Sequence, residues 1–194
     1  MPLIRISPPA TLPVSLEEMK SHSHIDGELA DARISDFLRT ATAKLDGRDG
    51  LLGRCLITQS WRLALDGFPP AIVLPLPPCQ AVLGITYLDS AGALQILAPD
   101  AYQVFGLGGS DPAQILPPFG GVFPAARRWP ESVIVEFRSG YGDAAADVPE
   151  PLRTAIKMHA AHLFEHRESV AAGTFTELSQ GYHDLALDYR IWGF

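Results

Sequence analysis

Three histidines and a glutamate near residue 160 are the residues whose types and spacing could do chemistry. His159, His162 and His166 stand at positions i, i+3 and i+7 of a predicted helix, and Glu165 lies beside the last of them. This spacing places the three imidazoles near one helical face. Because neutral imidazole is a common zinc ligand, a metal-dependent hydrolase is one interpretation of the chain.

The same spacing argues against a single bound ion. Seven residues rise about 10 Å along a helix, which is too far for three ligands whose bonds to zinc are about 2 Å long. His162 and His166 could share an ion, but the string HLFEH places its glutamate differently from the HExxH signature. We therefore expect no metal, and histidines that lie on a polar face or at an interface.

Other motifs that could bind a cofactor are incomplete. Gly106–Ser110 (GLGGS) lacks the Lys and Ser/Thr of a phosphate-binding loop. Asp46–Gly50 (DGRDG) lacks the downstream glutamate of a calcium loop. Cys55 and Cys79 form no CxxC pair, which favours free thiols. No GxSxG elbow and no pair of catalytic carboxylates is readable. We expect no catalytic residue, no cofactor and no enzymatic activity.

Composition excludes further classes of protein. The chain has 194 residues and a net charge of −7, so it lacks the basic surface of a nucleic-acid-binding protein. Hydrophobic residues make up 47 % and charged residues 19 %, yet no apolar run reaches the roughly 18 residues of a membrane span. The N-terminus has no apolar segment typical of a secretion signal, which favours the cytoplasm. The apolar excess indicates a large core, a surface buried between subunits, or both.

Two helices are predicted near the N-terminus. Ser15 and Glu18 have the spacing of a capping box that opens a helix over Leu16–Ser23. Asp26 would cap a second helix that ends before Gly47. Apolar residues recur at helical spacing in this second segment: Leu29, Ala32, Ile34, Phe37, Leu38, Ala41 and Leu45.

A longer helix is predicted near the C-terminus, over Pro149–Glu168, because proline is tolerated in a first turn. Gly173 would end the segment, and Tyr182–Tyr189 would form a last short helix. The apolar face of the long helix would consist of Ile156, Ala160, Leu163 and Phe164.

The middle of the chain is rich in β-branched and aromatic residues, which predicts strands over Ile57–Leu65, Ala81–Leu88 and Ser132–Arg138. The first of these alternates, so Ile57, Gln59, Trp61, Leu63 and Leu65 would be buried, and Thr58, Ser60, Arg62 and Ala64 exposed. The Gly/Pro-rich stretch Phe105–Pro124 predicts a long loop with a brief strand around Gln114–Leu116.

These elements predict an α+β fold in which N- and C-terminal helices form a bundle and an antiparallel β module is inserted between them. The expected parts are an N-terminal helical part over 13–54, a β-rich insertion over 55–146, and a C-terminal helix and tail over 147–194. The two helical parts would pack as one domain.

Several strings, in this order, carry a resemblance to a known family. They are Pro13–Lys20 (PVSLEEMK), Cys55–Leu63 (CLITQSWRL), Leu65–Pro69 (LDGFP), Leu74–Pro78 (LPLPP), Val82–Asp89 (VLGITYLD), Val135–Asp143 (VEFRSGYGD), Val148–Leu152 (VPEPL) and Phe164–Glu168 (FEHRE). Over about residues 13–170 the chain resembles the head–tail connector (adaptor) proteins of long-tailed phages, prophages and gene transfer agents.

The resemblance implies a structural subunit of a virion or phage-like particle assembled in the bacterial cytoplasm. Such proteins form a ring, typically of twelve subunits, beneath the portal protein. The ring extends the DNA channel, which DNA traverses without sequence-specific binding, and carries the stopper and tail proteins. The helices would form the ring body and channel wall. The β insertion would lie towards the outside or the tail. No membrane is involved.

Two aromatic segments are expected to dock partners, because large aromatic side chains anchor interfaces. The expected residues are Phe105, Phe119 and Phe123 in the Gly/Pro-rich loop, and Tyr189, Arg190, Ile191, Trp192 and Phe194 in the C-terminal segment. An alternative to the ring subunit is a free-standing β-type binding module whose ligand site is the loop over 105–124.

Overall fold

The computed structural model describes residues 2–165 and 180–192, which form helices and antiparallel sheets. The predicted α+β class is confirmed. The chain divides into two compact units. The sheet unit comprises residues 2–10 and 58–141, and the helical unit comprises residues 11–57, 142–165 and 180–192. No helix in these described segments is both long enough and apolar enough to cross a membrane.

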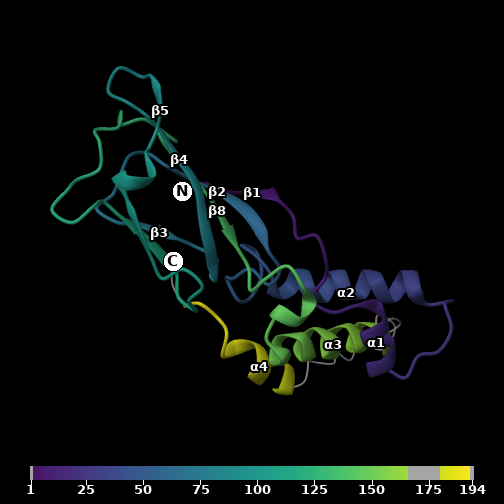
Figure 1. Cartoon of the computed structure of the whole chain (residues 1–194). Helices are drawn as coiled ribbons and strands as arrows, with labels where there is room; N and C mark the ends of the chain where they lie inside the picture. The colour runs from purple at the N-terminus through teal and green to yellow at the C-terminus, as the bar shows by residue number, and fades with distance from the viewer. Residues whose placement is uncertain (1, 166–179, 193–194) are drawn as a thin grey trace, which may run out of the picture. The chain divides into compact units, whose positions relative to one another are not determined.

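The larger sheet of the sheet unit has five antiparallel strands (Figure 1). Their spatial order is β1 (Leu3–Ser7), β2 (Gln59–Leu65), β8 (Val133–Ser139), β4 (Cys79–Leu88) and β5 (Leu94–Ile96). The three strands predicted from the sequence are thus β2, β4 and β8, with ends shifted by one or two residues. The central strand β8 pairs along its whole length with β2 and β4.

A smaller sheet has the order β3 (Ile72–Leu74), β7 (Ala113–Leu116) and β6 (Gln103–Phe105). The brief strand predicted around Gln114–Leu116 is confirmed as β7. The stretch predicted as one long loop is more ordered than expected, because Phe105 belongs to β6 and pairs with Gln114. A single turn of 3-10 helix over Pro99–Ala101 leads into β6.

Alternation in β2 follows the prediction except at one residue. Trp61 and Leu63 are buried, and Arg62 is exposed. Ala64 was expected to be exposed but is buried. Ala64 lies within the sheet, because its N–H donates to the Pro2 carbonyl on one side and it pairs with Ile134 of β8 on the other.

Strand β1 has no counterpart in the sequence analysis. It pairs with β2, and Ile4 lies opposite Arg62. Apolar and polar residues alternate from Ile4 to Ser7, but the segment is short and flanked by prolines, so no strand was predicted there. Such a short strand takes its stability from the sheet that it joins rather than from its own sequence.

The capping box of the first helix, α1 (Leu16–His22), is confirmed. The Ser15 hydroxyl accepts from the Glu18 N–H at 3.1 Å, and the Glu18 carboxylate accepts from the Ser15 N–H at 2.9 Å. Both partners satisfy amides that a helix start leaves unpaired.

The second helix, α2 (Asp31–Leu45), begins later than predicted. Ala30 occupies the cap position, so the expected cap at Asp26 is wrong, and Leu29 is fully exposed rather than part of the apolar face. The Lys20 ammonium explains the late start, because it binds the Gly27 carbonyl and the Asp31 carboxylate at 2.8 Å and so holds the preceding turn. The rest of the predicted face is buried at Ile34, Leu38, Ala41 and Leu45.

Helices α3 (Glu150–Glu165) and α4 (Gln180–Leu187) correspond to the two predicted C-terminal helices. Residues 166–168 of the predicted helix, and Gly173, lie outside the described residues. Within the helical unit α3 packs against both α2 and α4, and α1 packs against α2. The core of α3 includes His159 besides the predicted Ile156 and Ala160.

Candidate docking surfaces

The histidines of α3 do not form a metal site in the described residues. His159 is only 7 % exposed, so it belongs to the core of the helical unit. Its ring lies edge-on to that of Tyr182 in α4, with 5.4 Å between centroids. His166 falls outside the described residues. Across residues 2–165 and 180–192, no three His, Cys, Asp or Glu side chains come together as they would around an ion.

The contact between His159 and Tyr182 is buried and polar. Neither the Nδ1 atom of His159 nor the Tyr182 hydroxyl has a hydrogen-bond partner among the described residues. Burial lowers the pKa of His159, and positive charge at His162 and Lys44 lowers it further. Burial also raises the pKa of Tyr182. Both side chains are therefore neutral at pH 7, and the packing of α4 on α3 depends on a neutral imidazole.

The helical unit is expected to lose stability when the pH falls below about 6.5, the pKa of an unfolded histidine. The pKa of His159 in the folded chain lies below that value. Between the folded and the unfolded pKa, the unfolded chain binds more protons than the folded chain, so the free energy of unfolding decreases as the pH is lowered. Chemical denaturation at pH 7.5 and at pH 5.5 measures the loss.

His159→Phe keeps the ring contact with Tyr182 and should remove most of this pH dependence. His22→Gln is the matched control, because His22 is exposed at the end of α1. If His159→Phe showed the same pH dependence as the wild-type chain, His159 would not be its source.

The C-terminal segment after α4 is held by the loop that follows α2. The Ile191 N–H donates to the Leu52 carbonyl at 2.9 Å, and the Arg54 guanidinium donates to the Tyr189 carbonyl. Trp192 then projects outward with 72 % of its surface exposed, and the Arg190 guanidinium lies 4.4 Å from its ring centre. An anchored backbone thus presents an exposed aromatic side chain.

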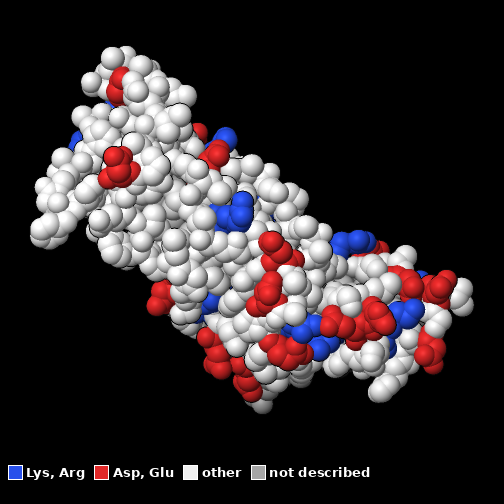
Figure 2. Space-filling view, in the orientation of Figure 1, with Lys and Arg blue, Asp and Glu red and all other residues white. Residues whose placement is uncertain are grey.

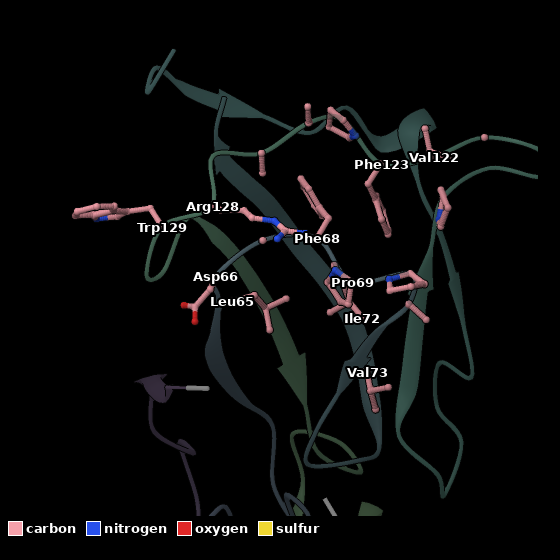
Figure 3. A pocket seen from close by; sticks show the side chains of 18 of the residues that line it. Leu65, Asp66, Phe68, Pro69, Ile72, Val73, Val122, Phe123, Arg128 and Trp129 are labelled. Carbon is pink, nitrogen blue, oxygen red and sulfur yellow. The ribbon is translucent and has the colours of Figure 1, made fainter. Parts of the chain in front are cut away.

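The sheet unit contains an open apolar groove of about 1170 Å³ (Figure 3). One wall is the segment from Leu65 to Val73, and the other comes from the segments 121–126 and 128–130 together with Pro117. We call this the proline groove, because five prolines line it: Pro69, Pro70, Pro117, Pro124 and Pro130.

Aromatic rings from both walls meet inside the proline groove. Phe68 and Phe123 stack with 4.8 Å between their centroids, and Tyr87 meets Phe68 edge-on at 5.4 Å. In Figure 3 the Arg128 side chain reaches towards Phe68, whereas Trp129 points away from the groove. The groove offers stacked aromatic surface with one cation at its mouth.

The residues expected to dock partners are dispersed. Phe123 lines the proline groove. Phe119 is fully exposed in the loop after β7, and Phe105 is half exposed at the end of β6, and neither lines the groove. In the C-terminal segment, backbone atoms of Tyr189 and Ile191 make the anchoring hydrogen bonds. The side chains of Arg190 and Trp192 stack on each other. Phe194 lies outside the described residues.

Phe68, Arg128 and Trp129 were not predicted to belong to one surface. They are brought together by the fold of the sheet unit, since the 65–73 and 117–130 segments are far apart in the sequence. The available signal was the concentration of proline in both segments.

Charge is distributed unequally between the two units. The sheet unit holds five of the 15 basic and six of the 22 acidic residues, so residues 11–57 and 142–193 together hold a net charge of −6. On the face seen in Figure 2, charged atoms gather over the helices, whereas the surface over the sheets is mostly uncharged. The helical unit is therefore acidic and the sheet unit is nearly neutral.

Chains of solved gene transfer agent (GTA) particles share this fold. A chain in the virion of a native GTA particle and one in the neck of an empty GTA particle, computed with C6 symmetry, each have a TM-score of 0.79 and 22 % sequence identity. A chain in the neck of a native GTA particle, computed with C12 symmetry, has a TM-score of 0.75 and the same identity. Each alignment covers 100 % of this chain and 97 % of the other.

The likeness spans both units, so the whole chain has the fold of a GTA particle component. GTA particles are among those that the sequence strings indicated, and the resemblance is confirmed in the fold. No protein-family model matches the sequence, and a comparison with curated proteins gives no match.

Proposed function

We propose that this chain is a structural, non-enzymatic subunit of the neck of a phage-like particle, joining head to tail. The observation that carries the proposal is the fold, which is shared over the full length with chains in the virion and neck of GTA particles. The subunit forms a ring, and the C12 symmetry of one of those necks supports twelve copies. The ring lies beneath the portal protein and holds the stopper and tail proteins below it, in a particle assembled in the bacterial cytoplasm.

The charge distribution supports a channel lined by the helical unit. DNA binds proteins mainly through phosphate contacts with Lys and Arg, which release counterions. A wall whose residues carry a net negative charge would not retain DNA that has to pass through it. The helices of this unit would pack as the bundle of the ring body, and the neutral sheet unit would make contacts with partner proteins.

The proposed partner surfaces are the two described above. The C-terminal segment with Trp192 would dock to the particle, because an exposed tryptophan on an anchored backbone loses little entropy on binding. The proline groove and the exposed Phe119 would contact the tail side.

The purified full chain, alone and mixed with the portal protein of the same particle, tests the proposal by native mass spectrometry and negative-stain imaging. We expect rings of twelve, formed by the chain itself or upon the portal. A chain that stays monomeric and has no affinity for the portal would overturn the proposed function.

Trp192→Ala is expected to weaken docking to the particle by about 30-fold, since a buried tryptophan anchor at an interface contributes about 2 kcal/mol. The free energy of unfolding should change by less than about 0.5 kcal/mol, because the side chain is mostly exposed. This point substitution leaves the Ile191 anchor intact, which a deletion of residues 190–194 would not. Titration of the portal and thermal unfolding measure the two effects.

Leu29→Ala is the control for this experiment, because Leu29 is also fully exposed in the helical unit but lies before α2. It should leave both docking and stability unchanged. Equal docking by both variants would exclude Trp192 as an anchor.

A further inference from the structure

The five-stranded sheet has two open edges, formed by β1 and β5. In the part of the chain that the structure describes, no strand pairs with the outer side of either one. Both edges expose aliphatic side chains at alternate positions: Ile4 and Ile6 on β1, and Leu94 and Ile96 on β5. The β5 residues are the more exposed, at 69 % and 78 %.

The hydrogen-bond pattern shows that β5 presents its backbone outward. The Leu97 N–H donates to the Ile85 carbonyl and the Asp89 N–H to the Ala93 carbonyl, both at 2.9 Å. In an antiparallel ladder bonded and non-bonded pairs alternate. The N–H and C=O groups of Leu94 and Ile96 therefore point away from β4, and are positioned to pair with another strand.

Edges of this kind are normally protected. Natural proteins keep edge strands very short, or place lysine, proline or inward-pointing charge on them, to prevent pairing with another chain. β5 is short, but its sequence, Leu94–Gln95–Ile96, contains no lysine, proline or charge. The only charge of β1 is positive, at Arg5, and the turn into β5 carries the negative Asp89. The two edges therefore carry no like charges that would repel each other.

The directions of the edge strands select head-to-tail pairing. Every neighbouring pair in the sheet is antiparallel, so the first and fifth strands, β1 and β5, run in the same direction. Adjacent copies in a ring of twelve are related by a rotation of only 30°, which hardly changes strand direction. The β5 strand of one copy and the β1 strand of the next would therefore form a parallel pair.

The faces of the two edges also match. Ile4 lies opposite Arg62, and the row that contains Ile96 passes through Thr86 and Ile134 to Ala64. Since Arg62 and Ala64 are two residues apart on one strand, Ile4 and Ile96 lie on the same face. If the next copy is shifted along the strand direction by two residues, about 7 Å, its Ile4 lies beside Ile96 of the first copy. A shift of this kind between neighbouring strands also tilts them, as in closed sheets.

We propose that β5 of each copy pairs with β1 of the next copy, so that the sheets join into one continuous belt around the ring. This inference rests on the proposed ring and names the contact between its subunits. Five strands at about 4.8 Å give about 24 Å per copy, so twelve copies would close a belt of about 46 Å radius.

Cysteine cross-linking tests the contact. The double variant I4C/I96C, treated with a short bismaleimide, should give a ladder of covalent multimers, because each copy offers one cysteine to each neighbour. The single variants I4C and I96C should give no dimer. The native Cys55 and Cys79 are buried, so the wild-type chain serves as the background control. Dimers from either single variant would mean two-fold pairing and would overturn the inference.

Ile96→Lys gives an independent test by adding the charge that protects natural edges. It should abolish rings and leave a folded monomer, since the Ile96 side chain is exposed. Leu83→Lys, at a half-exposed aliphatic residue of β4 away from the edges, should leave rings intact.

The outcomes separate this inference from the proposed function. Rings that give no cross-linked multimers, or rings formed by the Ile96→Lys variant, would overturn the edge contact alone. Cross-linked multimers of a chain that has no affinity for the portal would overturn the proposed function alone. Absence of rings and of cross-linked multimers, with and without the portal, together with no affinity for the portal, would overturn both.

Discussion

Phe137→Ala is expected to lower the free energy of unfolding of the sheet unit by about 3–5 kcal/mol. Phe137 is completely buried on β8, the central strand of the five-stranded sheet. It lies between Trp61 of β2 and Val82 of β4, so its loss leaves a cavity that neighbouring strands cannot fill without breaking pairs. Urea denaturation followed by tryptophan fluorescence measures the change.

Leu83→Ala is the control for this prediction, because it removes an aliphatic side chain from the same sheet at a half-exposed position. We expect a change of less than about 1 kcal/mol. A small effect of Phe137→Ala, equal to that of the control, would show that β8 is not the centre of the core.

The helices could be predicted from the sequence because their signals are local. Ser15 and Glu18 lie three residues apart, and the structure shows both hydrogen bonds of the capping box. The start of α2 could not be predicted in this way. It depends on Lys20, eleven residues before Asp31, and such a contact leaves no trace in helical periodicity.

The sheet edges and the proline groove depend on contacts between distant segments. β1 pairs with a strand more than fifty residues later, and the stacked rings of Phe68 and Phe123 lie on loops separated by several strands. Single-sequence patterns identify a strand but not its neighbours, so neither the open edges nor the groove was predictable. The same holds for His159, whose place on α3 was clear but whose burial depends on α4.

Most of the exposed large hydrophobic residues described in the sheet unit lie at four places, which are the β1 edge, the β5 edge, the proline groove and the loop with Phe119. A monomer would expose these places to water, whereas the proposed ring between head and tail would offer neighbours that could cover them. The low charge of this unit fits the same conclusion, because charged residues are depleted where protein surfaces are buried.

Arg153→Met is expected to lower the free energy of unfolding of the helical unit by about 2 kcal/mol, because it removes the charged hydrogen bonds that link α1 to α3, although their carboxylate partners are partly exposed. The Arg153 side chain is 13 % exposed and contacts the carboxylates of Glu18 and Glu150. Its Nε atom also donates to the Pro13 carbonyl at 3.1 Å. Methionine keeps much of the aliphatic packing, so the loss reports the polar contacts.

Arg39→Met is the matched control, since Arg39 pairs with Asp36 on the exposed surface of α2 and is 63 % exposed. Exposed ion pairs contribute little, and we expect less than about 0.5 kcal/mol. Equal effects of the two variants would contradict the role assigned to Arg153. Thermal and urea unfolding at pH 7 compare them directly.

The pH dependence gives a second measure of the Arg153 contacts. The bond from the Ser15 N–H lowers the pKa of Glu18 most and Arg153 lowers it further, whereas the bond from Lys157 is the main cause that lowers the pKa of Glu150. Carboxylates with lowered pKa contribute stability that is present above their unfolded pKa, near 4.3, and is lost as the pH falls through the folded value. The difference in free energy of unfolding between the wild-type chain and Arg153→Met should therefore become smaller between pH 5 and pH 3. A difference caused by packing alone would stay the same over this range.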